Sequence, residues 1–209
     1  MDKILIRKTV LNTRSALSAR EKSQAELIML ETLLNWEIFK KAGVIHIYIA
    51  KPDEPDTRQI IENCWSSGKR VAVPLVLPNT FNLIHSEIKS FDRLIYGMYG
   101  IQEPSPESRI IMTPDMFDLV IVPGVAFDKK GRRIGQGKGY YDRFLELTSA
   151  FRLALAFDCQ LLENVPSELH DIPMDAILSE SGILVNLPPE RTTRASAPGL
   201  ALLTVKNLA

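Results

Sequence analysis

The chain has 209 residues, of which 45% are hydrophobic and 24% are charged, and its formal net charge is zero. This size and composition are typical of one soluble globular domain with a substantial core. A zero net charge argues against a general nucleic-acid binder, which carries a basic excess. No stretch approaches the roughly 20 apolar residues that span a membrane, and Arg7 and Lys8 interrupt the apolar N-terminal run that a signal peptide needs. We therefore expect a cytoplasmic protein whose two cysteines, Cys64 and Cys159, are reduced.

Residues 3–17 are predicted to form a helix, because they contain neither glycine nor proline. At about 100° per residue, Lys3, Arg7 and Arg14 fall within about 40° of one another, and apolar residues border this cationic stripe on both sides. A stripe bordered in this way points inward, where a cation needs an anion as its partner. The alternative is that the long side chains extend past the apolar border to solvent. The pattern alone leaves both interpretations open.

The following segments alternate between helix and strand. Ser18 begins a capping box and with it a second helix. The segment Val44 to Ile49 is predicted as a strand, Thr57 to Trp65 as a helix, and Arg70 to Val73 as a second strand that Pro74 ends. A strand–helix–strand unit of this kind implies two parallel strands joined by a right-handed crossover.

An acidic loop follows the first of these strands. Asp56 is a candidate cap for the helix that comes next. Glu54 lies beyond the carboxyl end of the strand, where open α/β sheets place their ligand-binding groups. Ile49, at the end of the same strand, is a plausible apolar wall of the same pocket.

The C-terminal half adds further strands. Residues 152–157 form a continuous apolar run that predicts a central strand, residues 161–165 are predicted as a short helical turn, and residues 176–178 are predicted as another strand. Residues 187–209 are polar and proline-rich at first and weakly apolar at the end. The sequence thus predicts a single three-layer α/β domain over residues 1–186, with a mostly parallel sheet and helices on both faces, followed by a C-terminal extension over residues 187–209.

The segment from Val120 to Leu145 is the most informative part of the chain. A short β-branched run predicts a buried strand that ends at Pro123, and a helical pattern begins at Tyr140. Between them lie glycines and cations, namely Gly131, Gly135, Gly137 and Gly139 with Lys129, Lys130, Arg132, Arg133 and Lys138. Alternating glycines let backbone N–H groups approach an oxyanion, and a helix start adds further N–H donors. The alternative is a mobile surface hairpin with solvated cations, but the coincidence of these features favours an anion site.

Two separate groups of cations suit a polyphosphate better than a single phosphate. ATP in proteins normally travels with Mg²⁺, which is held by one or two carboxylates, phosphate oxygens and water. Asp142 lies at the start of the predicted helix, within reach of a phosphate bound in the loop, although it could equally stabilise the helix dipole. Asp175 begins a strand and could equally serve in a turn or as a cap.

The same segment resembles a known family. The run RIGQGKGYYDR, residues 133–143, resembles the R-L-G-x-G-x-G-Y-Y-D-R signature of the 5-formyltetrahydrofolate cyclo-ligase family. The motif PG-x-x-FD-x-x-G that precedes it, residues 123–131, and the motif G-I-x-E-P at residues 100–104 are also similar to the family pattern. The resemblance covers roughly Lys3 to Glu180, and the isoleucine in place of the usual leucine is a conservative departure.

The resemblance implies a Rossmann-like topology and an ATP-dependent ligase reaction. In that reaction 5-formyltetrahydrofolate is cyclised to 5,10-methenyltetrahydrofolate, and ADP and phosphate are released. The formyl oxygen attacks the γ-phosphorus, the nitrogen at position 10 then adds to the activated carbon, and phosphate leaves. The implied partners are a reduced folate, ATP and Mg²⁺, with no nucleic acid and no membrane.

The resemblance also implies roles for individual residues. Catalytic roles fall on Arg133, Lys138 and Tyr140. The implied ATP site contains Lys3 and Arg7 from the first helix and a run from the loop, consisting of Arg133, Ile134, Gly135, Gln136, Gly137, Lys138, Gly139, Tyr140 and Tyr141. The implied folate site consists of Ile49, Glu54, Gln136, Lys138 and Tyr140. Asp142 and Asp175 match the metal-associated acids of the family and are expected to hold Mg²⁺ together.

Two other functions remain open at this stage. One is an ATP-independent enzyme similar to a sugar-phosphate isomerase or a CoA-transferase, which would use the anion loop without ATP. The other is a non-enzymatic protein that binds folate or nucleotide and has kept the pocket. Turnover without ATP would indicate the first, and binding without release of ADP would indicate the second.

Overall fold

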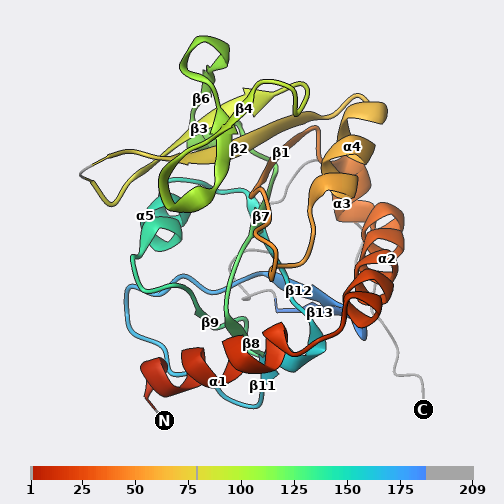
Figure 1. Cartoon of the computed structure of the whole chain (residues 1–209), viewed down its shortest axis with the longest axis vertical. Coiled ribbons are helices and arrows are strands. Elements are labelled where there is room, and N and C mark those ends of the chain that lie inside the picture. Colours follow the sequence, from red (N-terminus) through yellow and green to blue (C-terminus); the bar gives the residue numbers. More distant parts are fainter. Residues whose placement is uncertain (1, 79, 187–209) are drawn as a thin grey trace.

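A computed structural model describes residues 2–78 and 80–186 of the chain. Its centre is an eight-stranded sheet with the strand order β13-β12-β10-β7-β1-β2-β3-β6 (Figure 1). The five strands from β12 to β2 run parallel, and their bounds are β12 Ala176–Ser179, β10 Phe151–Leu155, β7 Leu119–Val122, β1 Val44–Ile47 and β2 Arg70–Val76. The three outer strands are antiparallel to their neighbours, namely β13 Gly182–Val185, β3 Leu83–Ile88 and β6 Ile110–Met112. The predicted α/β class and the mostly parallel sheet are confirmed.

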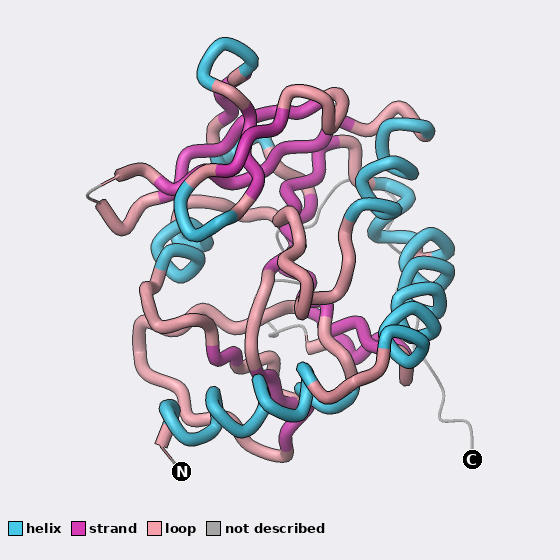
Figure 2. Tube along the Cα trace, in the orientation of Figure 1, coloured by secondary structure: helices cyan, strands magenta, loops and turns pink. Residues whose placement is uncertain are grey.

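Helices cover both faces of this sheet. One face carries α2 (Ala19–Asn35), α3 (Glu37–Lys41) and α4 (Arg58–Ser66), and the other carries α5 (Tyr140–Glu146), as Figures 1 and 2 show. The central strand β7 serves both layers, because successive side chains of a strand point to opposite faces. Leu119 and Ile121 pack in the core cluster that contains residues of α2 and α4. Val120 and Val122 pack in the cluster that contains Phe144 of α5.

The glycine-rich segment is more ordered than a surface loop. Its first part forms an antiparallel hairpin of β8 (Ala126–Asp128) and β9 (Arg133–Ile134), and β11 (Leu161–Leu162) adds to β8 in parallel. Helix α1 (Lys3–Ser15) packs on this small sheet through Ile6 and Val10. The prediction of a helical turn at residues 161–165 is therefore wrong. Leu161 and Leu162 instead form β11, which pairs with β8. The periodicity of the sequence does not reveal this partner strand.

The strand β2 also differs from its prediction, because it continues through Pro74 to Val76. Beyond Ala72 it has no partner in β1, and Pro74 pairs only with His85 of β3. A proline lacks the N–H that a second neighbouring strand would require, so it is tolerated where a strand is paired on one side only. The capping box at Ser18 is present as predicted.

The remaining elements are short. A hairpin of β4 (Leu94–Tyr96) and β5 (Gln102–Pro104) leaves the main sheet and encloses the 3₁₀ turn η1 (Met98–Gly100). Three further 3₁₀ turns are η2 (Pro106–Ser108), η3 (Pro114–Met116) and η4 (Asp158–Gln160). Cys64 and Cys159 are free thiols. Within the described part of the chain, no helix is long and apolar enough to cross a membrane. The predicted C-terminal extension, residues 187–209, lies outside the described residues.

Candidate active site

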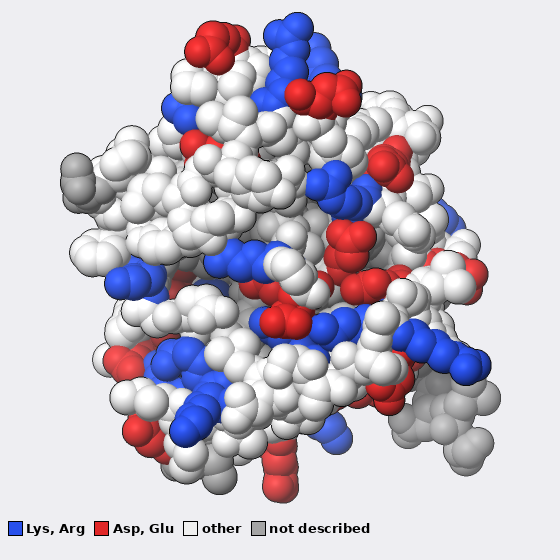
Figure 3. All heavy atoms as spheres, viewed as in Figure 1, with Lys and Arg blue, Asp and Glu red and all other residues white. Residues whose placement is uncertain are grey.

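A cleft of about 1060 Å³ lies between α1, the central glycine-rich segment and the β4–β5 hairpin. We call residues 133–139 the glycine loop and residues 166–173 the acidic segment. Both contribute to the walls of the cleft, together with the loop that follows β1 and the first turns of α1 and α5. The space-filling view shows Lys and Arg side chains beside Asp and Glu side chains across the middle of this face (Figure 3). The cleft therefore contains both signs of charge in close contact.

The glycine loop is bound to α1. Arg7 donates from Nε to the carbonyl oxygen of Gly135 at 2.9 Å. Gly137 has a φ of +88°, and a Cβ at that position would lie 3.5 Å from Nη2 of Arg7. Gly139, with a φ of +66°, is the residue that precedes the first turn of α5. These left-handed backbone angles explain why glycine occurs at both positions.

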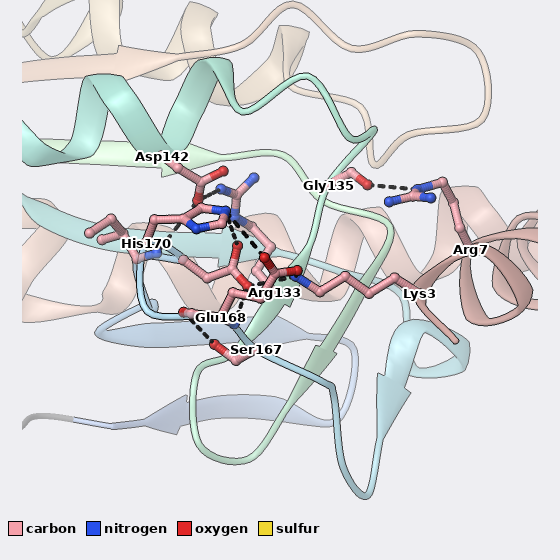
Figure 4. Close-up of polar contacts among 10 residues, drawn as sticks. Lys3, Arg7, Arg133, Gly135, Asp142, Ser167, Glu168 and His170 are labelled. Carbon is pink, nitrogen blue, oxygen red and sulfur yellow. Dashed lines mark hydrogen bonds and ion pairs between the residues drawn. The ribbon is translucent and has the colours of Figure 1, made fainter. Parts of the chain in front are cut away.

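Lys3 reaches from α1 to the acidic segment. Its Nζ lies 2.8 Å from Oδ2 of Asp171 and 2.9 Å from Oε1 of Glu168. Figure 4 shows Lys3 directed toward Glu168, while Arg7 points toward Gly135. Partial burial alone would lower the pKa of Lys3, but the hydrogen bonds from the two carboxylates outweigh it and raise that pKa. The ammonium is therefore firmly cationic.

Arg133 is a third cation of the site, and it is almost fully buried. Its Nη2 lies 2.6 Å from Oδ1 of Asp142, and its Nη1 donates to the carbonyl oxygen of Pro123 at 3.4 Å. A Cβ on Gly135 would lie 3.0 Å from Nη1 of Arg133, so the guanidinium lies directly behind the glycine loop. Asp142 also lies 3.5 Å from the backbone nitrogen of Ile172, which belongs to the acidic segment.

Arg14 points inward, which is one of the two interpretations that the stripe on α1 left open. It is 4% exposed, and its Nε and Nη1 have no hydrogen-bond partner among the described residues. It does not line the cleft. Lys3 and Arg7 do line it, so the first helix supplies two cations to the cleft and buries a third behind it.

The loop after β1 forms another part of the cleft wall. Ile49 and Glu54 both line the cleft, and Glu54 accepts a hydrogen bond from the backbone N–H of Lys51 at 3.1 Å. Tyr141 of α5 lies within electrostatic reach of Glu54, and burial raises the pKa of the Tyr141 hydroxyl. That hydroxyl is buried and has no hydrogen-bond partner in the described part of the chain. A buried hydroxyl that lacks a partner is costly unless a ligand supplies one.

The β4–β5 hairpin closes one end of the cleft. Tyr99 lines it and has a φ of +59°, the only positive φ of a non-glycine residue among those described. Tyr140 lines the same end, and a hydrogen bond between its neutral hydroxyl and the Tyr99 side chain raises the pKa of Tyr140. Tyr96 is exposed and does not line the cleft. A strained backbone angle at a ligand cleft is a common mark of a functional residue.

The remaining predicted residues of the loop are brought together in the cleft. Gln136 and Lys138 are exposed and line it, as do Gly135, Gly137, Gly139 and Ile134. The carbonyl oxygen of Lys138 accepts a hydrogen bond from Nη2 of Arg143 at 2.6 Å. The loop is thereby tied both to α1 and to α5.

The two acids predicted to share Mg²⁺ lie in different environments. Asp142 lines the cleft. Asp175 does not; it is 2% exposed, and its Oδ2 accepts the backbone N–H of Arg152 at 2.8 Å. Among residues 2–78 and 80–186, no three His, Cys, Asp or Glu side chains are grouped as a metal site. Asp142 is therefore placed to contact a ligand in the cleft, whereas Asp175 makes a structural contact with the backbone of Arg152.

Sequence reasoning missed the acidic segment as part of the site. Glu168, His170 and Asp171 all line the cleft. His170 is exposed, and its Nε2 lies 3.8 Å from Oε2 of Glu168. The segment connects the parallel strands β10 and β12, so it belongs to a crossover that begins at the carboxyl ends of the strands. A segment that follows the carboxyl end of a predicted parallel strand is where a ligand site is expected, and this position could have identified the acidic segment from the sequence.

Comparisons with known proteins identify the family and fold that the chain resembles. The model of the 5-formyltetrahydrofolate cyclo-ligase family matches residues 1–180. The 5-formyltetrahydrofolate cyclo-ligase of Escherichia coli strain K12 is 30% identical over 174 residues, which cover 81% of this chain and 96% of that protein. The Haemophilus influenzae protein of the same name is 32% identical over 177 residues, covering 83% and 95%. The solved structure of Aquifex aeolicus 5,10-methenyltetrahydrofolate synthetase has a TM-score of 0.80 and 28% identity, and covers 97% of each chain.

Proposed function

This chain belongs to the 5-formyltetrahydrofolate cyclo-ligase family, and from that premise we propose that its cleft holds a reduced folate and ATP against each other. The chain is a cyclo-ligase that converts 5-formyltetrahydrofolate to 5,10-methenyltetrahydrofolate. The observation that carries the residue-level proposal is the convergence of two cation groups, one from α1 and one from the glycine loop, on a single cleft.

The phosphates of ATP belong at the cationic side. Lys3 and Arg7 approach from α1, Lys138 approaches from the glycine loop, and Arg133 lies behind that loop. The backbone N–H groups of the glycine loop are the proposed ligands of the phosphate oxygens, because glycines let the backbone approach an oxyanion closely. Cations from two elements can neutralise a polyphosphate along its length.

The folate belongs at the part of the cleft formed by the loop after β1 and by Tyr141. Glu54 supplies a carboxylate there, Ile49 supplies an apolar surface, and the unpartnered hydroxyl of Tyr141 supplies a hydrogen-bonding group. Tyr140, whose side chain contacts that of Tyr99, lies at the end of the cleft that the β4–β5 hairpin closes. Gln136 is the residue of the glycine loop that we assign to the folate.

The reaction requires alignment more than a protein nucleophile. The formyl oxygen of the folate attacks the γ-phosphorus. The bond between that phosphorus and the bridging oxygen breaks, and ADP leaves with the electron pair. Nitrogen 10 then attacks the activated carbon, its proton is lost, and phosphate departs with the former formyl oxygen. The chain contributes by holding both substrates in line and by placing Lys138, Lys3 and Arg7 near the charge that is transferred.

Mg²⁺ is part of the proposal, because protein-bound ATP normally carries it. Asp142 fits as a single carboxylate ligand, since it lines the cleft and adjoins the buried Arg133. When bound, the ion supplies positive charge to the phosphate oxygens. Asp175 as a second ligand remains a prediction, and its present contact with the backbone of Arg152 must change before it can coordinate.

The direct test mixes the purified protein with 5-formyltetrahydrofolate, ATP and Mg²⁺ and follows the near-ultraviolet absorbance of methenyltetrahydrofolate. We expect a rise in absorbance that requires ATP and that is abolished when Mg²⁺ is omitted. Product formed without ATP would instead indicate an isomerase-like or transferase-like enzyme. Folded protein that binds ATP but releases no ADP would indicate a binding protein.

A further inference from the structure

The two carboxylates that hold Lys3 are not equivalent. The side chain of Asp171 is only 16% exposed, and its Oδ2 accepts the backbone N–H of Glu168 at 2.7 Å as well as the ammonium of Lys3. The side chain of Glu168 is 59% exposed and holds Lys3 through Oε1 alone. Asp171 is therefore fixed by the backbone of its own segment, whereas Glu168 can turn away into solvent.

The same segment touches the second cation group. The backbone nitrogen of Ile172, next to Asp171, lies 3.5 Å from Oδ1 of Asp142, which in turn binds Arg133. Figure 4 shows Lys3, Glu168, Arg133 and Asp142 gathered between α1 and α5. Movement of Asp171 would disturb both cation groups, whereas movement of the exposed Glu168 side chain would disturb only its own contact with Lys3.

An ammonium group has three N–H donors. In the structure, two of the donors of Lys3 are used by Asp171 and Glu168. A phosphate that enters the cleft needs Lys3, and it is repelled by the negative charge of both carboxylates. Exchange of Glu168 for a phosphate oxygen removes one repelling charge and leaves the buried contact intact. Exchange of Asp171 would leave the N–H of Glu168 without its acceptor.

We propose that Asp171 is a positioning residue that keeps Lys3 directed at the ATP phosphates, and that Glu168 is an exchangeable partner that releases Lys3 when phosphate binds. This inference rests on the proposed function, because it requires ATP in the cleft. It assigns opposite effects to two acids that bind the same ammonium. An acidic cluster that merely lines the cleft would not behave in this way.

The test compares the Asp171→Asn and Glu168→Gln variants by calorimetry with a non-hydrolysable ATP analogue and Mg²⁺. Asparagine keeps the acceptor for the Glu168 N–H but loses the charge, so we expect binding to weaken by about tenfold. Glutamine at 168 removes an exposed competitor for Lys3, so we expect binding to tighten by about two- to threefold. Glu163→Gln is the matched control, because Glu163 is exposed and lies outside the cleft. In turnover, KM for ATP should move while kcat changes much less.

A second measurement does not depend on catalysis. Amine-acetylation rates at Lys3, read by mass spectrometry, are compared with those at Lys8, which is exposed on the same helix. We expect Lys3 to react more slowly than Lys8, and ATP to slow it further. Asp171→Asn should accelerate acetylation of Lys3, and Asp171→Glu, which restores the charge, should partly reverse that change. The rate at Lys8 should be the same in every variant.

The outcomes separate this inference from the proposed function. A wild-type protein that does not bind ATP overturns both. A wild-type protein that binds ATP, with two acid variants that both weaken or both tighten binding, overturns the inference and leaves the function standing. The same holds if Asp171→Asn and Glu163→Gln give equal affinities and equal acetylation of Lys3. If Asp171→Asn does not fold, the ATP affinities of the Asp171→Glu and Glu168→Gln variants are compared with that of the wild type instead.

Discussion

Nδ1 of His85 lies 3.0 Å from Nε2 of His46, and both imidazoles are buried beneath α5. His46 lies on β1 and His85 on β3, and the rings of Phe117, Tyr141 and Phe144 surround them. Burial lowers the pKa of His46, as does the neighbouring His85. Burial also lowers the pKa of His85 to about 4. The pair is therefore neutral at physiological pH, and it supports the helix that carries Tyr141 and Asp142.

This pair predicts a loss of stability in mild acid. In the unfolded chain both histidines take up protons near pH 6.5. In the folded state His85 stays neutral until the pH approaches 4, and burial holds the pKa of His46 well below its usual value. The unfolded state thus binds more protons, and the free energy of unfolding should fall as the pH drops from about 6.5 toward 4, by up to about 1.4 kcal/mol per pH unit for each proton. Urea denaturation at several pH values measures this slope.

The histidine variants provide the controls for that slope. His85→Leu should reduce the fall in the free energy of unfolding between pH 6.5 and pH 4, because one protonation site is gone. His170→Gln should leave it unchanged, since His170 is exposed. A slope that is the same in wild type and in His85→Leu would show that the buried pair does not control acid stability.

Gly137→Ala should damage ATP binding more than it damages stability. An alanine in the left-handed region costs about 1–2 kcal/mol, and Gly137 has a φ of +88° and adjoins Arg7. Relief of that strain moves the loop amides away from the phosphate, so we expect KM for ATP to rise by roughly tenfold. Gly68→Ala is the matched control, because Gly68 has a φ of +74° and no other group lies within 4 Å of the place that its Cβ would occupy. Equal KM values in the two variants would argue against a phosphate-binding role for the loop.

Tyr141→Phe separates ligand binding from stability. The Tyr141 hydroxyl is buried without a partner among the described residues, so its removal should leave the free energy of unfolding unchanged or raise it by about 1 kcal/mol. KM for the folate should nevertheless rise several-fold, because the bound substrate loses a hydrogen bond. Tyr48→Phe is the comparison, since the Tyr48 hydroxyl already donates to the carbonyl of Pro55 at 3.2 Å and its loss should reduce stability. A large loss of stability in Tyr141→Phe with unchanged KM would contradict this assignment.

The two candidate metal ligands should respond differently to loss of charge. Asp142→Asn should raise the Mg²⁺ concentration needed for half-maximal turnover and should also cost about 1–3 kcal/mol, because the buried Arg133 loses its charged partner. Asp175→Asn should mainly lower the melting temperature, since the carboxylate of Asp175 accepts the backbone N–H of Arg152. Magnesium titrations and thermal melts of both variants test this. An unchanged melting temperature with a raised Mg²⁺ requirement in Asp175→Asn would restore it as a metal ligand.

Local signals predicted much of the fold. The capping box at Ser18, the apolar run of β10 and the strand–helix–strand unit around α4 all depend on residues that are close in sequence, and all are present. The continuation of β2 through Pro74 could not be predicted, because it depends on where β1 ends. The strand at Leu161 could not be predicted either, since its partner is β8.

In the candidate site, too, the features set by residues close in sequence could be predicted, and those set by distant residues could not. The spacing of Lys3 and Arg7 on one helix and the glycines of the loop indicated the cationic side of the cleft. The acids that hold Lys3 are 165 and 168 residues away in the chain, and only the crossover between β10 and β12 brings them near. No local pattern shows that Asp171 is fixed and Glu168 exposed, because that difference arises from tertiary packing.

The position of Lys3 has a practical consequence for handling the protein. Because Lys3 lies in the cleft wall, any affinity tag or fusion partner joined directly ahead of it would stand beside the proposed phosphate site. Such an addition could obstruct substrate entry or place foreign charges beside the ammonium. Preparations intended for kinetic work should therefore release any N-terminal addition completely, and the purity of that cleavage should be checked by intact-mass measurement.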